Sequence, residues 1–187
     1  KIEILNKGCF RSCPLDEVDL PSLKKIYTNV FTDCDVSKAE FSVLETANSL
    51  PIIQNSIIAL PSTFKECTED TIGRNYIIYG TSGTYAEQWA KDNEHTFIEI
   101  SQDTAILEDV PAEYYGLGEI ISPYIIGFNK TYQWYSNTEA NNTTGTPIKG
   151  ATSKDFNPAD YESAPYYYCV VTSTDKDCPS VEVRTGV

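Results

Sequence analysis

The residues that could perform chemistry in this chain are a single histidine, six cysteines and an excess of carboxylates. His95 follows Glu94, and neither residue belongs to a recognisable catalytic signature. A cysteine–histidine nucleophile needs a thiol within hydrogen-bond reach of the imidazole, and no local pattern places one there. We therefore expect His95 to be a solvated loop residue, and we expect the chain not to be an enzyme, with no catalytic residues and no cofactor.

Metal-binding patterns are equally sparse. Zinc sites pair cysteines or histidines at short spacing, and although Cys9 and Cys13 are four residues apart, no second pair follows. Asp33 and Asp35, like the acidic loop at 155–162, could supply oxygen ligands to calcium. A solvated acidic surface explains the same carboxylates more simply, so we expect no metal site.

A repeat of 21 residues organises the first part of the chain. Polar residues fill most positions between its apolar ones, so each copy can bury its apolar side only against a neighbouring copy. This pattern predicts a solenoid. The positions that recur are Ile2, Leu5, Phe10, Cys13, Leu15, Val18 and Leu20, matched by Leu23, Ile26, Phe31, Cys34, Val36, Ala39 and Phe41.

The repeat continues more weakly beyond its second copy. Ile57 is expected to be equivalent to Val36, and a two-residue contraction after it brings residues 60–62 to the position of residues 20–22. Because the first equivalent residue is Ile2, the chain begins inside a repeat. We interpret it as a fragment, since repeat arrays normally end in a polar cap.

The motif F-x-x-C-x-L-x-x-V-x-L-P-S-L-x-x-I, which begins at Phe10, resembles the irregular leucine-rich repeats of BspA-type bacterial surface proteins. Residues 77–93 resemble the closing segment of the same family, and the resemblance covers residues 1–100. Thr84 and Glu87 have capping-box spacing, which predicts a short capping helix that stops at Asn93. The resemblance implies adhesion to host or bacterial surface proteins. The outward binding candidates are Glu17, Asp19, Lys38 and Glu40.

Residues 101–187 alternate between β-rich runs and clusters of Gly, Asn, Pro and Asp, which favours a β-sandwich. The pattern around Trp134, Tyr167 and Cys169 resembles a bacterial immunoglobulin-like domain. The resemblance makes Trp134 the core tryptophan and Tyr167 the corner tyrosine two residues before the cysteine. The predicted strands are 120–126, 131–135, 146–148, 166–173 and 180–187.

The cysteines leave two pairings open. Cys169 has no partner in 120–126, where an antibody domain would place one, so it either pairs with Cys178 across the last hairpin or both remain thiols. Cys13 and Cys34 occupy equivalent positions in successive coils, close enough for a disulfide. For this second pair a ladder of buried thiols is the favoured interpretation.

These patterns predict a mainly β chain: a short leucine-rich repeat solenoid over 1–100, closed by a capping helix, then an immunoglobulin-like β-sandwich over 101–187. The net charge of −13 argues against binding to nucleic acid or anionic membranes. No apolar run is long enough to span a bilayer, and no signal peptide is evident at the start. We expect an extracellular or cell-surface protein, although a cytosolic fragment has the same features.

The leading functional expectation is a non-enzymatic protein that mediates protein–protein interaction or adhesion. Two alternatives come from other classes. The first is a carbohydrate-binding module that stacks sugar rings on outward tyrosines, because the chain has thirteen tyrosines and many of them are in the second half. The other is a structural spacer of a larger surface protein.

Overall fold

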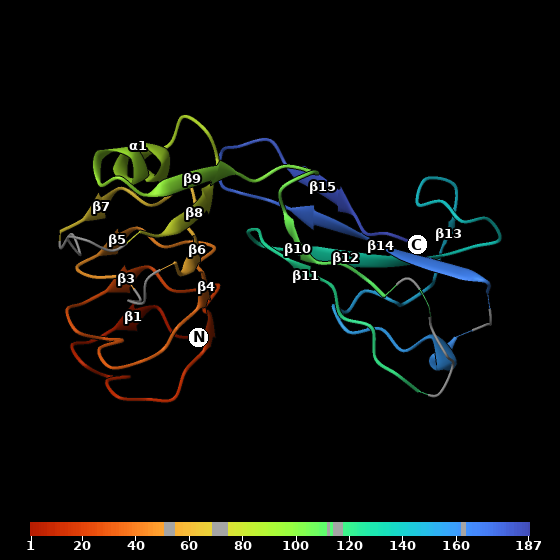
Figure 1. Cartoon of the computed structure of the whole chain (residues 1–187), viewed down its shortest axis with the longest axis horizontal. Coiled ribbons are helices and arrows are strands. Elements are labelled where there is room, and N and C mark those ends of the chain that lie inside the picture. Colours follow the sequence, from red (N-terminus) through yellow and green to blue (C-terminus); the bar gives the residue numbers. More distant parts are fainter. Residues whose placement is uncertain (51–54, 69–74, 112, 114–117, 162–163) are drawn as a thin grey trace. The chain divides into compact units, whose positions relative to one another are not determined.

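The computed structural model describes the chain except for residues 51–54, 69–74, 112, 114–117 and 162–163. It divides into two compact units, visible in Figure 1. The first comprises Lys1–Ile100 together with Gly127–Asn129 and Thr174–Pro179, and the second comprises Ser101–Ile126, Lys130–Ser173 and Ser180–Val187.

Short parallel strands build the first unit into a β-solenoid of about four turns, so the predicted mainly β solenoid is confirmed. Each turn adds one strand to a four-stranded sheet and one to a five-stranded sheet. The first sheet contains β1 (Ile4–Leu5), β3 (Lys25–Ile26), β5 (Thr46–Ala47) and β7 (Glu66–Cys67). The second contains β2 (Glu17–Asp19), β4 (Lys38–Glu40), β6 (Ile57–Ala59), β8 (Ile77–Gly80) and β9 (Thr96–Glu99).

The register of β1 with β3 and of β2 with β4 follows the repeat of 21 residues. The expected equivalence of Ile57 with Val36 is wrong, because Ile57 pairs with Lys38 in the β4–β6 ladder. The contraction therefore occurs before Ile57 rather than after it. This register places Ile58, which is fully buried, beside the inward-facing Ala39.

Tight turns recur at equivalent positions in the first two coils. Gly8 and Asn29 have φ of 67° and 58°, and Ser12 and Asp33 have φ of 57° and 59°. Glycine and short polar residues tolerate this left-handed region better than other residues do. The repeat therefore preserves backbone conformation as well as apolar positions.

Polar contacts between successive coils accompany this stacking. Lys24 Nζ lies 3.1 Å from Glu3 Oε2, and the Ser37 hydroxyl donates to Asp16 Oδ1 at 2.6 Å. Exposed ion pairs of this kind contribute about 0–1 kcal/mol each, so burial of the apolar ladder dominates stability. Its fully buried members include Leu23, Ile26, Val36, Phe41, Leu44, Ile58, Leu60, Phe64 and Ile78.

The helix that the structure describes in the first unit, α1 (Tyr85–Asp92), lies between β8 and β9 in the chain and has Asn93 as its C-cap, where the sequence predicted its end. The capping box is not formed. Glu87 Oε2 accepts from the backbone N–H of Gly83, one residue before the expected Thr84, and the Thr84 hydroxyl donates to the carbonyl of Thr81. The hydrogen bond between Glu87 and Lys91 is the main reason that the pKa of Glu87 is lowered.

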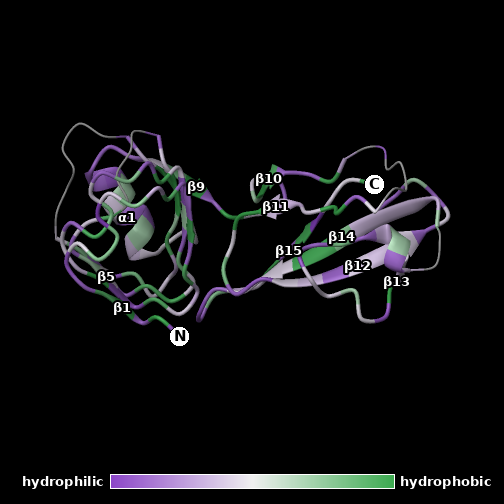
Figure 2. Cartoon of the chain, turned by 90° about the horizontal axis from the view of Figure 1, so that it is seen from below, coloured by the Kyte–Doolittle hydropathy of each residue, from purple (hydrophilic) through white to green (hydrophobic). Residues whose placement is uncertain are grey.

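The second unit consists of antiparallel strands. One sheet pairs β10 (Ile106–Glu108) with β11 (Tyr124–Ile125), and the other has the order β13-β12-β14-β15. The predicted strand 120–126 is shorter than expected, because only β11 and an isolated bridge from Ile121 to Phe156 form there. The remaining elements are β12 (Thr131–Asn137), β13 (Thr146–Pro147), the 3₁₀ helix η1 (Pro158–Asp160), β14 (Tyr166–Ser173) and β15 (Val181–Arg184). The apolar run of β14 is visible in Figure 2.

Candidate functional site

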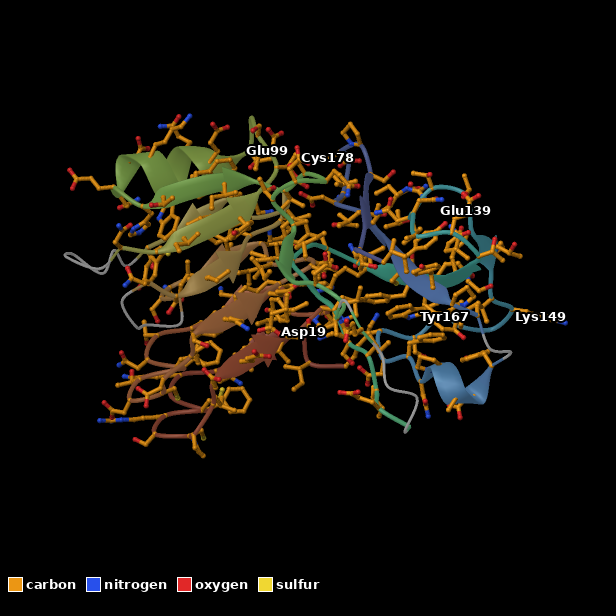
Figure 3. All side chains as sticks on the ribbon, turned by 45° about the vertical axis from the view of Figure 1, so that its right-hand side comes forward. Asp19, Glu99, Glu139, Lys149, Tyr167 and Cys178 are labelled. Carbon is orange, nitrogen blue, oxygen red and sulfur yellow. The ribbon has the colours of Figure 1, made fainter. Side chains whose placement is uncertain are left out.

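Three of the four predicted binding residues lie on one face of the five-stranded sheet. Alternation along each strand turns Val18 and Ala39 inward and leaves their neighbours outward. Glu17 pairs with Lys38 across β2 and β4, and their side chains form an ion pair of 3.2 Å. We call Glu17, Asp19 and Lys38 the charged strip; Asp19 is labelled in Figure 3.

The fourth predicted residue, Glu40, is not available for binding. It is opposite Asp19 in the ladder, but only 6% of its surface is exposed. Its carboxylate accepts from the backbone N–H of Gly127, and the neighbouring Ser42 hydroxyl accepts from Asn129 N–H at 3.1 Å. The segment Gly127–Asn129, which belongs to the same unit, therefore buries Glu40.

The same face of the sheet becomes apolar beyond β4. Ile57 and Ile77 continue the row that contains Lys38, while Ala59 and Tyr79 continue the row that contains Glu40. Tyr79 is 7% exposed, and its burial raises the pKa of its hydroxyl. The charged strip is consequently confined to β2 and β4.

Two of the carboxylates considered for calcium, Asp33 and Asp155, have other partners. Asp33 lies 3.6 Å from Arg11 Nε, and its carboxylate also accepts from the Ser12 hydroxyl. Asp155 accepts from the Ser122 hydroxyl, and Glu162 of the same acidic loop is outside the described residues. Among the residues that the structure describes, no three His, Cys, Asp or Glu side chains are grouped to hold a metal ion.

His95 is buried, which corrects the expectation of a solvated loop residue. Only 7% of its surface is exposed, and its ring lies 4.7 Å from that of Tyr76 and 4.9 Å from that of Trp89. Glu94 adopts φ of 59°, and the backbone N–H of His95 then donates to the carbonyl of Ala90. His95 is thus a packing residue between α1 and the last coil.

Trp134 lies in the core of the second unit, where the sequence placed it. It is 1% exposed, stacks on Phe156 at 4.5 Å, and donates its indole N–H to the carbonyl of Ser153. The hydroxyl of Tyr167 accepts from the backbone N–H of Ala164 at 2.9 Å. Both aromatic side chains are therefore held by ring packing or backbone hydrogen bonds.

None of the six cysteines forms a disulfide. Cys169 cannot meet Cys178 because its neighbours in the sheet are Trp134 on β12 and Thr185 beyond β15, whose hydroxyl accepts from Cys169 N–H. In the repeats, the Cys34 thiol contacts the carbonyl of Phe10 at 2.9 Å, and Cys13 remains a separate thiol. The ladder of thiols, rather than a disulfide, is therefore the arrangement at Cys13 and Cys34.

Burial makes Cys169 chemically inert. It has no exposed surface, and burial raises the pKa of its thiol to about 12, so at pH 8 about one molecule in ten thousand carries the reactive thiolate. We expect a thiol reagent to modify the exposed Cys9 in the folded protein and to modify Cys169 only after denaturation. Mass spectrometry of peptides labelled with and without urea measures this, and rapid native labelling of Cys169 would contradict the structure.

A cleft in the second unit was not found by sequence reasoning. It has a volume of about 380 Å³, and Trp134, Tyr166 and Tyr167 supply its aromatic lining. Val110, Pro111 and other residues distant in sequence complete it. We call it the aromatic cleft. The adjacent tyrosines at 166–168 were the only sequence signal for it.

No family model, characterised protein or solved structure matches the chain. The described helix is too short to cross a membrane.

Proposed function

We propose that this chain is a non-enzymatic binding protein of the cell-surface or secreted type, and that the first unit binds another protein through the charged strip. The observation that carries the proposal is the position of Glu17, Asp19 and Lys38 on adjacent parallel strands of a rigidly stacked sheet. Main-chain hydrogen bonds between β2 and β4 fix the backbone positions of these residues before a partner arrives. Pre-organisation of this kind lowers the entropic cost of association.

The partner we propose is a protein with a basic surface patch. The strip carries two carboxylates and one ammonium group, and the chain as a whole carries a net charge of −13. Charge complementarity would accelerate encounter with a basic partner and select against acidic ones. Host or bacterial surface proteins are the class that the sequence resemblance suggests.

We also propose a fold type for each of the two units. We propose that the solenoid is of the BspA leucine-rich repeat type with α1 as its cap, and the burial of Ala86, Trp89 and Ala90 on one helix face supports this. For the second unit we propose an immunoglobulin-like sandwich. Support comes from the buried Trp134 and from Tyr167, whose hydroxyl bonds to the backbone three residues upstream.

The test is a binding screen of the full chain. Fibronectin, laminin, collagen and fibrinogen are immobilised, and association is followed by biolayer interferometry at physiological and high salt. We expect saturable binding to at least one of them, with an association rate that falls as salt rises. Absence of saturable binding to the whole panel would contradict adhesion and leave the spacer as the better account.

A further inference from the structure

The aromatic cleft is large enough for a small ligand. Its volume of about 380 Å³ lies within the range of about 300–1,000 Å³ that is usual for ligand sites. Its described lining residues all belong to the second unit, whereas the charged strip belongs to the first.

The walls of the cleft are held in place before any ligand binds. Trp134 is fixed by Phe156 and by the hydrogen bond to Ser153. Tyr167 is fixed by its hydrogen bond from Ala164 N–H and packs against Phe156 at 5.4 Å. A ligand therefore meets aromatic surfaces that need little ordering.

Tyr166 is the exposed one of the three aromatic residues that line the cleft. It is 37% exposed, whereas Trp134 is 1% exposed. Other tyrosines of the unit already use their ring faces: Tyr135 stacks on Tyr168 at 5.0 Å, and Tyr161 stacks on Phe156 at 5.2 Å.

The lining chemistry selects the class of ligand. The described lining residues are mainly apolar or aromatic. They include no Lys or Arg, and Glu113 is the charged residue among them. Without a cation the cleft disfavours phosphates, sulfates and other anions. A ligand that has an apolar ring face and hydroxyl groups at its edge fits this lining. Its ring face can stack on tyrosine rings, and its hydroxyl groups can hydrogen-bond to tyrosine hydroxyls and a carboxylate.

We propose that the aromatic cleft binds a pyranose ring of a neutral polysaccharide, with Tyr166 as the stacking surface. This site is independent of the protein-binding strip and adds a second specificity to the chain. Trp134 lines the cleft, so we expect occupancy to change its fluorescence.

The test is affinity electrophoresis of the full chain in native gels that contain neutral polysaccharides: a β-glucan, a galactomannan and a xyloglucan. We expect at least one to retard the wild-type protein, and Tyr166→Ala to weaken binding at least about tenfold, as for a central aromatic contact. Tyr166→Phe keeps the ring and should retain most of the affinity. Tyrosine fluorescence and circular dichroism verify that each variant is folded.

Tyr27→Ala is the matched control, because Tyr27 is 38% exposed, belongs to the first unit and is not among the lining residues of the cleft. It should bind as the wild type does. The proposal is overturned if no neutral polysaccharide retards the wild type, or if Tyr27→Ala and Tyr166→Ala weaken binding equally. Neither of these outcomes bears on protein binding by the charged strip.

Discussion

Replacement of Trp134 by alanine is expected to destabilise the second unit by about 3–5 kcal/mol, the cost usual for truncating a large buried aromatic side chain. The side chain is 1% exposed, and its removal takes from the Phe156 ring the nearer of its two stacking partners, at 4.5 Å. The Ser153 carbonyl also loses its hydrogen bond of 3.0 Å from the indole. Both losses act on a buried site, where neither water nor neighbouring side chains readily compensate.

Hydrogen exchange followed by mass spectrometry measures this effect locally. In Trp134→Ala, the free energy of opening of the amides in β12 and β14 should fall by about 3–5 kcal/mol. These two strands pair directly at Trp134 and Cys169. Trp134→Phe is the matched variant, since it keeps a ring against Phe156 and loses only the indole N–H. It should cost clearly less than Trp134→Ala. Equal costs for the two variants would show that ring stacking is not what holds this core.

Replacement of Phe64 by alanine is expected to cost a similar amount, about 3–5 kcal/mol, and to loosen α1. Phe64 is fully buried in the last coils of the solenoid. Its ring lies 5.6 Å from that of Tyr85 and 6.1 Å from that of Trp89, the two aromatic residues of the helix. An eight-residue helix is not stable alone, so its stability depends on these contacts.

The measurement is amide exchange of α1 in Phe64→Ala and in Tyr85→Ala. Tyr85 is 39% exposed and contacts the same ring, so its truncation removes less buried surface and should cost less. Unchanged protection of α1 in Phe64→Ala would show that the helix is held by other contacts.

The repeated apolar positions made the solenoid predictable, because a periodic ladder over 21 residues buries itself only by stacking. The site of the contraction was not predictable. The strands are two to four residues long, and a shift of the register by two residues preserves the alternation of inward and outward positions. Val36 and Lys38, the two residues that Ile57 could match, are two positions apart, and only the pairing with β4 decides between them.

The burial of Glu40 and His95 depended on contacts that local sequence does not reveal. The alternation of residues along β4 correctly predicted that Glu40 lies on the outward face of the sheet. Gly127–Asn129, a segment distant in the chain, covers it there. His95 has polar neighbours in sequence, yet the left-handed turn at Glu94 directs it between aromatic rings. The aromatic cleft was missed for the same reason, since its lining comes from segments separated by many residues.

Charge reversal of the strip tests the central claim most directly. Affinity for any matrix protein that binds in the screen is measured for the wild type, for Glu17→Lys/Asp19→Lys, and for Glu139→Lys/Asp160→Lys. The last variant changes the net charge equally at exposed positions of the second unit, where Glu139 is labelled in Figure 3. We expect the strip variant to lose at least about tenfold in affinity, or 1.4 kcal/mol, and the control to lose little. Equal losses in the two variants, or none in either, would contradict a protein-binding role for the charged strip.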